Sequence, residues 1–209
     1  MLCSLPEAVS RSELDVGVET RLLGRAAHAG VDVPAGLVLL RQAEQTFYLT
    51  NNLPERIRAI FAPLNLRRLD EEAFEQACER AAALVRECVL LDDLTYMLHL
   101  AAHNAGVTGL AHWRRPGAGA AEAASGRAGS LLVSLKRLWA GDWEVDTTLE
   151  RFEATGAIGL EPRPALLLDG MVGERDVVLS SRVGALLGTP GVAFTSAGRL
   201  TAFLPPSSA

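Results

Sequence analysis

The stretch VGVETRLLGRAAHAGVDVPAGLV, residues 16–38, contains the local signals that decide how the fold begins. Apolar residues in its first half recur at helical spacing, and Gly30 supplies a conformation in which helices commonly end. Pro34 and Gly36 then predict a turn, and the apolar residues 37–40 after it predict a buried strand. The chain is therefore expected to open with a helix, a turn and a buried strand.

Outward from this stretch, the sequence divides into a helical first half and a second half of short apolar segments. The change occurs at Gly106, after which Gly and Pro separate the apolar segments. Residues 115–130 are rich in Gly, Ala and Ser, which predicts a loop, either a flexible linker or a backbone cradle. We predict helices over 42–49, from Pro54, from Asp70, from Asp92 or Asp93 to Gly106, and over 134–143, and strands over 107–113, 131–133, 165–168, 176–179, 192–195 and 200–204.

These elements predict an α+β fold of 209 residues, long enough for one sizeable domain or two small lobes. We expect a helix-rich lobe over 1–114 and the Gly/Ala loop over 115–130. The short helix and strands over 131–204 would complete the sheet of the first lobe or form a second small lobe. The proline- and serine-containing tail, 205–209, is expected to be disordered.

Composition narrows the classes of function. With 49% hydrophobic residues, 22% charged residues and a mean hydropathy of +0.18, the chain can bury enough apolar surface to fold. A net charge of −5 argues against a nucleic-acid partner, because phosphate backbones demand a basic surface. Lys136 is the single lysine, so the primary amine that commonly polarises a transferring phosphoryl group is available at one position only.

The cysteines and the N-terminus predict a cytoplasmic protein. Cys3, Cys78 and Cys88 form an odd set without CxxC spacing, so neither a disulfide framework nor a zinc site is indicated. The sequence has no leader pattern, and no apolar run approaches the ~20 residues that span a bilayer. We therefore expect a reducing compartment and no membrane partner.

Residues 16–38 resemble the opening of the nucleotide-binding domain of phosphoenolpyruvate synthase and pyruvate phosphate dikinase. The family pattern is roughly G-G-K-x-x-N-L-x-x-L followed by A-G-x-x-V-P-x-G-F, and its second half is matched at Ala29, Gly30, Val33, Pro34 and Gly36. Similarity continues in order along most of the chain. Residues 165–172, ALLLDGMV, and 191–195, GVAFT, are similar to two family strands. The resemblance implies the front part of an ATP-grasp-like PEP/pyruvate-binding domain, with a helix-rich first lobe and a small mixed sheet.

The sequence departs from the family at positions that handle phosphate. Glu19 stands where the family has a lysine that contacts nucleotide phosphates, so the charge is reversed. The family arginine corresponds to Arg114, or to Arg115 in a shifted register, and the serines that follow it are replaced by Arg115 and Pro116. A carboxylate at position 19 would repel a triphosphate. The family's metal-binding acidic residues lie beyond the strand matched by 191–195, and this sequence ends at Ala209.

Three arginines flank the Gly/Ala loop and are the candidate anion or nucleotide contacts: Arg114, Arg115 and Arg127. Guanidinium groups and free backbone N–H groups can together hold an anion. The alternative is a solvated linker that carries scattered arginines. No catalytic residue is predicted.

His99 and His103 stand four residues apart on a predicted helix, the spacing of two metal ligands on one face. The sequence offers no clear third ligand near them, so ordinary surface or partly buried histidines are the alternative, and no metal site is predicted.

Two functions of different class follow from the resemblance and its departures. The first is a non-catalytic pseudoenzyme or accessory module that binds a protein partner, a nucleotide or a phosphorylated metabolite. The second is a subunit of a split ATP-dependent phosphotransferase of the dikinase type, whose metal ligands and phosphohistidine lie on another chain. The first implies no cofactor, whereas the second implies ATP and magnesium.

Overall fold

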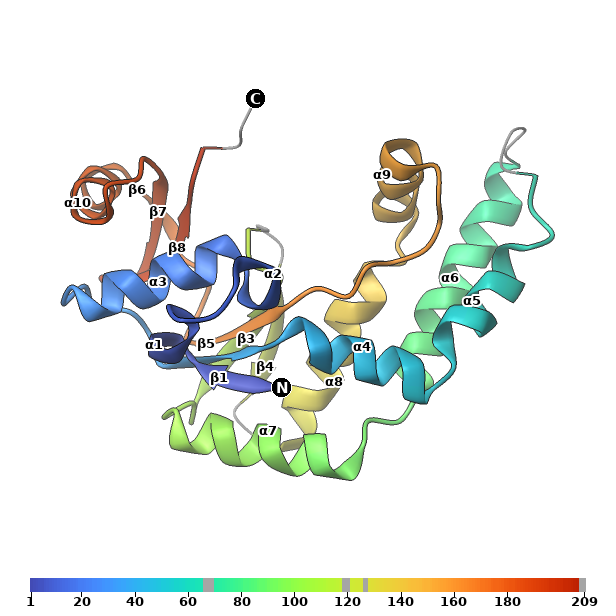
Figure 1. Cartoon of the computed structure of the whole chain (residues 1–209), viewed down its shortest axis with the longest axis horizontal. Helices are drawn as coiled ribbons and strands as arrows, with labels where there is room; N and C mark the ends of the chain where they lie inside the picture. Colours follow the sequence, from blue (N-terminus) through green and yellow to red (C-terminus); the bar gives the residue numbers. More distant parts are fainter. Residues whose placement is uncertain (66–69, 118–120, 126–127, 207–209) are drawn as a thin grey trace.

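The computed structural model describes residues 1–65, 70–117, 121–125 and 128–206, and these form an α+β fold with two antiparallel sheets (Figure 1). One sheet has five strands in the order β1-β2-β5-β3-β4, and the other has three in the order β6-β7-β8. The strands are β1 (Leu2–Ser4), β2 (Gly36–Leu39), β3 (Leu110–Arg114), β4 (Ala121–Ser125), β5 (Ala165–Asp169), β6 (Glu174–Asp176), β7 (Val192–Ser196) and β8 (Arg199–Leu204). The helices are α1 (Leu5–Ala8), α2 (Glu13–Val16), α3 (Val18–His28), α4 (Arg41–Thr50), α5 (Leu53–Phe61), α6 (Glu71–Glu87), α7 (Asp92–Asn104), α8 (Ala128–Gly141), α9 (Val145–Thr155) and α10 (Val177–Leu187).

Strand β5 lies at the centre of the five-stranded sheet although it comes late in the sequence. Leu167 is paired with Leu37 of β2 on one side and with Trp113 of β3 on the other. The second half of the chain therefore completes the first sheet, and it also supplies the separate sheet β6–β8. The second sheet shares an apolar core with β2 and β5 of the first, so whether residues 131–204 form a lobe of their own stays a prediction.

The expectation of a mixed sheet is wrong, because every strand pair in the described residues is antiparallel. Apolar runs such as those of β2 and β5 are buried on both faces, and burial of this kind is also typical of parallel strands. Whether two strands pair parallel or antiparallel depends on the path of the chain between them. The pattern of apolar residues within a strand does not predict that path.

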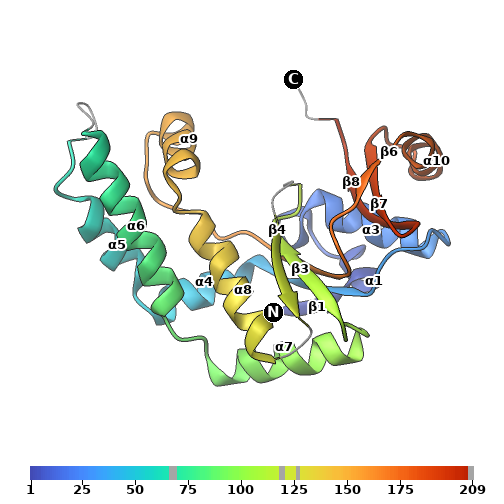
Figure 2. The ribbon, with the colours of Figure 1, turned by 180° about the vertical axis from the view of Figure 1, so that it is seen from behind.

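The five-stranded sheet separates two apolar cores, because successive side chains of a strand point to opposite faces. Leu37, Trp113 and Leu167 belong to the core shared with α4–α8, whereas Val38 and Leu166 belong to the core shared with α1, α3, α10 and the second sheet. Figure 2 shows α5 and α6 at one end of the molecule and α10 with β6–β8 at the other.

Three local predictions differ from the structure. Ala121–Ser125, expected within the loop 115–130, forms β4, which pairs with β3 in the register Ala111↔Ala124. Residues 131–133, expected as a strand, lie inside α8. Residues 177–179, also expected as a strand, begin α10, because Asp176 Oδ1 accepts a hydrogen bond of 2.8 Å from the backbone N–H of Leu179 and so caps a helix.

Further expectations concern the tail, the cysteines and the membrane. Residues 207–209 of the tail lie outside the described residues. All three cysteines are buried with free thiols. In the described ranges, every helix is too short or too polar to cross a membrane.

Candidate functional site

The first helical turn of α3 lies directly against the end of β3. Gly17, which precedes this turn, has a φ of 82°, and a Cβ there would lie 2.6 Å from Cβ of Pro116. A glycine is therefore required both by the backbone conformation and by the close approach of residue 116. This contact brings Glu19 of α3 beside Arg114, the last residue of β3, and both side chains are buried.

Glu19 and Arg114 form a two-pronged ion pair. Nη1 and Nη2 of Arg114 donate to Oε2 and Oε1 of Glu19, the second at 2.6 Å. The backbone N–H of Gly117 donates to the same Oε2 at 2.7 Å, and Arg114 Nη2 also donates to the carbonyl oxygen of Thr201 in β8 at 2.8 Å. Bidentate geometry of this kind gives the strongest hydrogen bonds between a guanidinium and a carboxylate. The pair ties α3, β3 and β8 together.

The two positions that the resemblance assigns to phosphate contact are thus bound to each other. The anion that Arg114 binds in this structure is the protein's own carboxylate. The carboxylate lies in the first turn of α3, where the helix dipole and the N–H of Gly117 favour a negative charge. Glu19 therefore occupies the hydrogen-bonding groups of Arg114 that face α3.

Arg115 lies on the opposite side of the sheet from Arg114 because neighbouring side chains of an extended chain alternate. It donates to both carboxylate oxygens of Glu44 in α4, at 2.6 and 3.1 Å, and also to Asp142 between α8 and α9. Arg163 donates to Asp142 through its side chain and to Glu44 through its backbone N–H. Two carboxylates and two guanidinium groups balance each other in this network.

Burial and charge act in opposite directions on the pKa values of this second network. Burial raises the pKa of Glu44, and the facing Arg115 opposes that rise. For Arg115, burial alone would lower the pKa, but the carboxylates of Glu44 and Asp142 raise it above its usual value. The Arg115 guanidinium stays charged, and its hydrogen bonds go to two carboxylates of the protein itself.

The third predicted anion contact, Arg127, lies outside the described residues. Arg114 and Arg115 face different partners, so the structure does not bring the predicted arginines together around one ligand. Whether they bind an external anion stays a prediction. His99 and His103 lie on α7, and among the residues described, no group of three or more His, Cys, Asp or Glu is arranged to hold a metal ion.

Sequence reasoning missed His112, which lies on the same face of β3 as Arg114. The imidazole is buried, and its Nδ1 lies 2.9 Å from the carbonyl oxygen of Gly170. Burial lowers the pKa of His112, and the nearby charge of Arg114 lowers it further. Within the described chain, Nε2 has no hydrogen-bond partner. His112 is therefore a neutral imidazole beside the Glu19–Arg114 pair.

A separate cavity of about 490 Å³ opens beside α5, lined mostly by apolar side chains that include Ile57, Phe61 and Leu160. Tyr48 and Trp143 also line it, and the indole N–H of Trp143 donates to the Tyr48 hydroxyl at 2.8 Å. The volume is within the range of small-molecule sites, but the lining suits an apolar group better than a phosphate.

The fold and these contacts define an α+β protein that carries buried ion pairs where β3, an inner strand of its larger sheet, ends. No protein-family model matches the chain, and the curated proteins include no sequence similar to it.

Proposed function

We propose that this chain is a non-catalytic relative of the nucleotide-binding domain of phosphoenolpyruvate synthase and pyruvate phosphate dikinase, and that it acts as an accessory module through binding rather than phosphotransfer. One observation carries the proposal. Glu19, at the position that the resemblance gives to a phosphate-contacting lysine, is locked to Arg114, at the position of the family arginine.

Electrostatics opposes the entry of a nucleotide phosphate at this pair. A phosphate reaching Arg114 would have to displace a carboxylate that accepts hydrogen bonds from both the guanidinium and the N–H of Gly117. The displaced carboxylate would then be buried without a partner, and breaking a buried pair costs about 3–5 kcal/mol. If Glu19 stayed, a triphosphate would meet a like charge at close range.

The shifted register leads to the same conclusion. If Arg115 is the counterpart of the family arginine, its guanidinium is already bound to Glu44 and Asp142. In either register the candidate arginine neutralises carboxylates of its own chain, so the proposal does not depend on the choice of register.

Titration calorimetry of the purified protein with magnesium and ATP tests the proposal. We expect no saturable heat at nucleotide concentrations up to the millimolar range, in which weak ligands are still detected. Micromolar affinity for ATP would contradict the proposal. Titration with inorganic phosphate under the same conditions separates a general anion site from a nucleotide site.

The alternative of a split phosphotransferase has its own test. The chain is incubated with labelled ATP and extract from its own cells, with and without added chain. Phosphorylation of another polypeptide that depends on the chain would favour the subunit role over the accessory role, whereas equal labelling in both mixtures is expected here.

A further inference from the structure

Helix α7 exposes an apolar stripe flanked by charge-complementary ends. Its inner face, Leu94, Leu98 and Ala102, is buried. The α7 outer face, as named here, consists of Asp93, Tyr96, Met97, Leu100 and His103, whose spacing of three and four residues places them together on a helix. Tyr96 is 68% exposed and Leu100 is 47% exposed.

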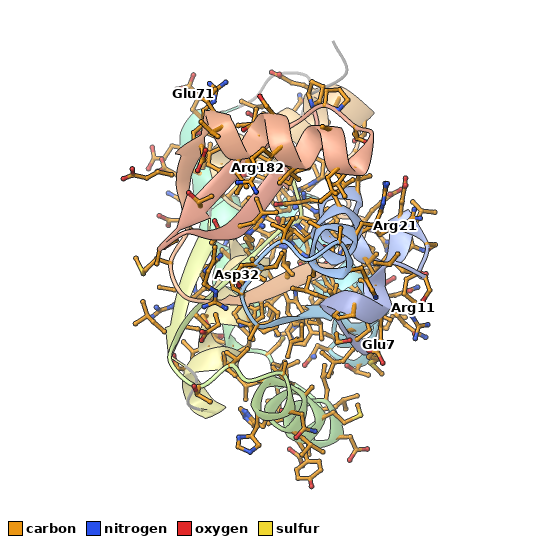
Figure 3. All side chains as sticks on the ribbon, turned by 90° about the vertical axis from the view of Figure 1, so that its left-hand side faces the viewer. Glu7, Arg11, Arg21, Asp32, Glu71 and Arg182 are labelled. Carbon is orange, nitrogen blue, oxygen red and sulfur yellow. The ribbon has the colours of Figure 1, made fainter. Side chains whose placement is uncertain are left out.

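The position of α7 leaves this face open. Figures 1 and 2 show α7 along the lower edge of the molecule, with the other described helices and strands on its inner side. In Figure 3 the helix is seen end-on at the bottom, and the side chains on its outer side point away from the rest of the molecule. Exposed apolar residues continue past both ends of the helix, at Val89, Leu91 and Leu110. Large apolar residues that are exposed next to one another, as Tyr96, Met97 and Leu100 are on α7, are typical of an interaction site.

Two pairs of residues on the α7 outer face share one midpoint in the sequence. Positions 96 and 100 lie at equal distances from position 98 along the sequence, and so do positions 93 and 103. If the outer faces of two copies of α7 cross antiparallel at the level of position 98, Tyr96 of one copy faces Leu100 of the other. Asp93 then faces His103 of the second copy. Each contact occurs twice, as a two-fold symmetric interface requires.

We propose that the α7 outer face binds the same face of a second copy of this chain, antiparallel, and so forms a symmetric dimer. Tyr96, Met97 and Leu100 would be removed from water, and an imidazole N–H of His103 would donate to the carboxylate of Asp93 on the other copy. Antiparallel packing also sets the acidic first turn of each helix beside the C-terminal turn of its neighbour, which the helix dipoles favour. This inference is independent of the proposed function.

The charges of α7 favour a second copy over a lipid surface. Helices that lie on membranes carry Lys or Arg on their polar face, and α7 has neither, whereas it begins with Asp92 and Asp93. One helix pair with its flanks is a small interface by comparison with the ~800 Å² per partner of stable complexes. We therefore expect association in the micromolar range.

Sedimentation equilibrium tests the dimer over protein concentrations from about 1 to 500 µM, which bracket the expected dissociation constant. The wild type is expected to shift from monomer to dimer within this range. Leu100→Glu should remain monomeric. Leu14→Glu, a change at an exposed leucine of α2, should dimerise as the wild type does, and circular dichroism should show that both variants are folded.

A charge exchange tests the antiparallel geometry itself. Asp93→Lys removes the carboxylate that accepts from His103 of the second copy, and His103→Asp brings two carboxylates together. We expect each single variant to weaken dimerisation about tenfold, and the double variant, which joins an ammonium to a carboxylate, to recover to within about threefold of the wild type. Only an interface that joins these two positions between copies gives this recovery.

Each remaining outcome overturns the proposal. These outcomes are a wild type that stays monomeric over the whole range, a dimer that survives Leu100→Glu, and single variants whose losses add in the double variant. A monomeric wild type would leave the α7 outer face to a different protein. Nucleotide binding by the same preparation would bear on the proposed function alone, so the two failures can be told apart.

Discussion

At the scale of single residues, the Glu19–Arg114 pair is a buried contact between two charges of the protein itself. Each member alone would be a buried charge, and together they satisfy one another and the N–H of Gly117. Buried pairs of this kind add little net stability when complete but are costly to break. The pair is therefore best examined by removing one member.

Replacing Glu19 by alanine is expected to lower the free energy of unfolding by about 3–5 kcal/mol, because Arg114 would be left buried without its counter-charge. Urea denaturation measures this loss. Millimolar phosphate should restore part of the stability of the variant, since the vacated site again offers a guanidinium and a backbone N–H to an anion.

The control is Glu13→Ala, which removes an exposed ion pair with Arg21 of 2.7 Å. Its expected loss is below about 1 kcal/mol, the usual value of a surface pair. Similar losses in the two variants, or no effect of phosphate on Glu19→Ala, would contradict our account of the buried site.

His112 should make stability depend on pH. Its pKa is lowered from 6.5 in the folded protein because the imidazole is buried. As the pH falls below about 6.5, the unfolded chain takes up a proton that the folded chain does not, so the free energy of unfolding decreases. Urea denaturation at several pH values between 7.5 and the acid range measures the slope, with the wild type steeper than His112→Gln.

His28→Gln, at an exposed histidine of α3 outside the α7 outer face, serves as the control for replacing a histidine. An unchanged slope in His112→Gln would show that other groups carry the pH dependence.

Residue-scale contacts were only partly foreseeable. Glu19 and Arg114 could be singled out by position, but their contact joins residues 95 apart in the sequence. The sequence around Glu44 does indicate that this residue is buried. It lies three and four residues before Phe47 and Tyr48, which places a carboxylate on the buried face of α4 and implies a buried cationic partner.

At the scale of elements, the sequence predicted the helices of the first half well because periodicity and caps are local signals. A helix was predicted to begin at Asp70, for example, and Asp70 is its N-cap, because its side chain accepts from the N–H of Ala73 at 3.1 Å. Strand β4 could not be found in this way, because its small residues acquire their order from pairing with β3 and packing under α8.

The cap at Asp176 decides whether the apolar residues after it form a helix. Asp176→Ala should therefore destabilise α10 and lower the free energy of unfolding by about 0.5–2 kcal/mol. Asp176→Asn should be close to the wild type, because an amide oxygen caps equally well. Thermal or urea denaturation of the two variants makes the comparison, and equal losses would show that the cap is not what orders α10.

At the scale of the whole molecule, the spacing of apolar and polar residues predicted the α+β class but left the topology open. The sequence left open whether the later strands complete the first sheet or form a second lobe. In the structure β5 lies within the first sheet, and β6–β8 form a second sheet that packs on the same apolar core. Antiparallel pairing of β2 with β5 depends on contacts between segments that lie far apart, and no local pattern carries that information.

The central place of β5 has a consequence for how the protein is made. On the ribosome, β2 and β3 emerge long before β5, the strand that separates them in the finished sheet. During that interval both strands present unpaired backbone groups and apolar side chains, a state that favours aggregation. Nascent chains that stop short of residue 165 should therefore be the ones that chaperones hold, and release should follow once residue 169 has left the exit tunnel.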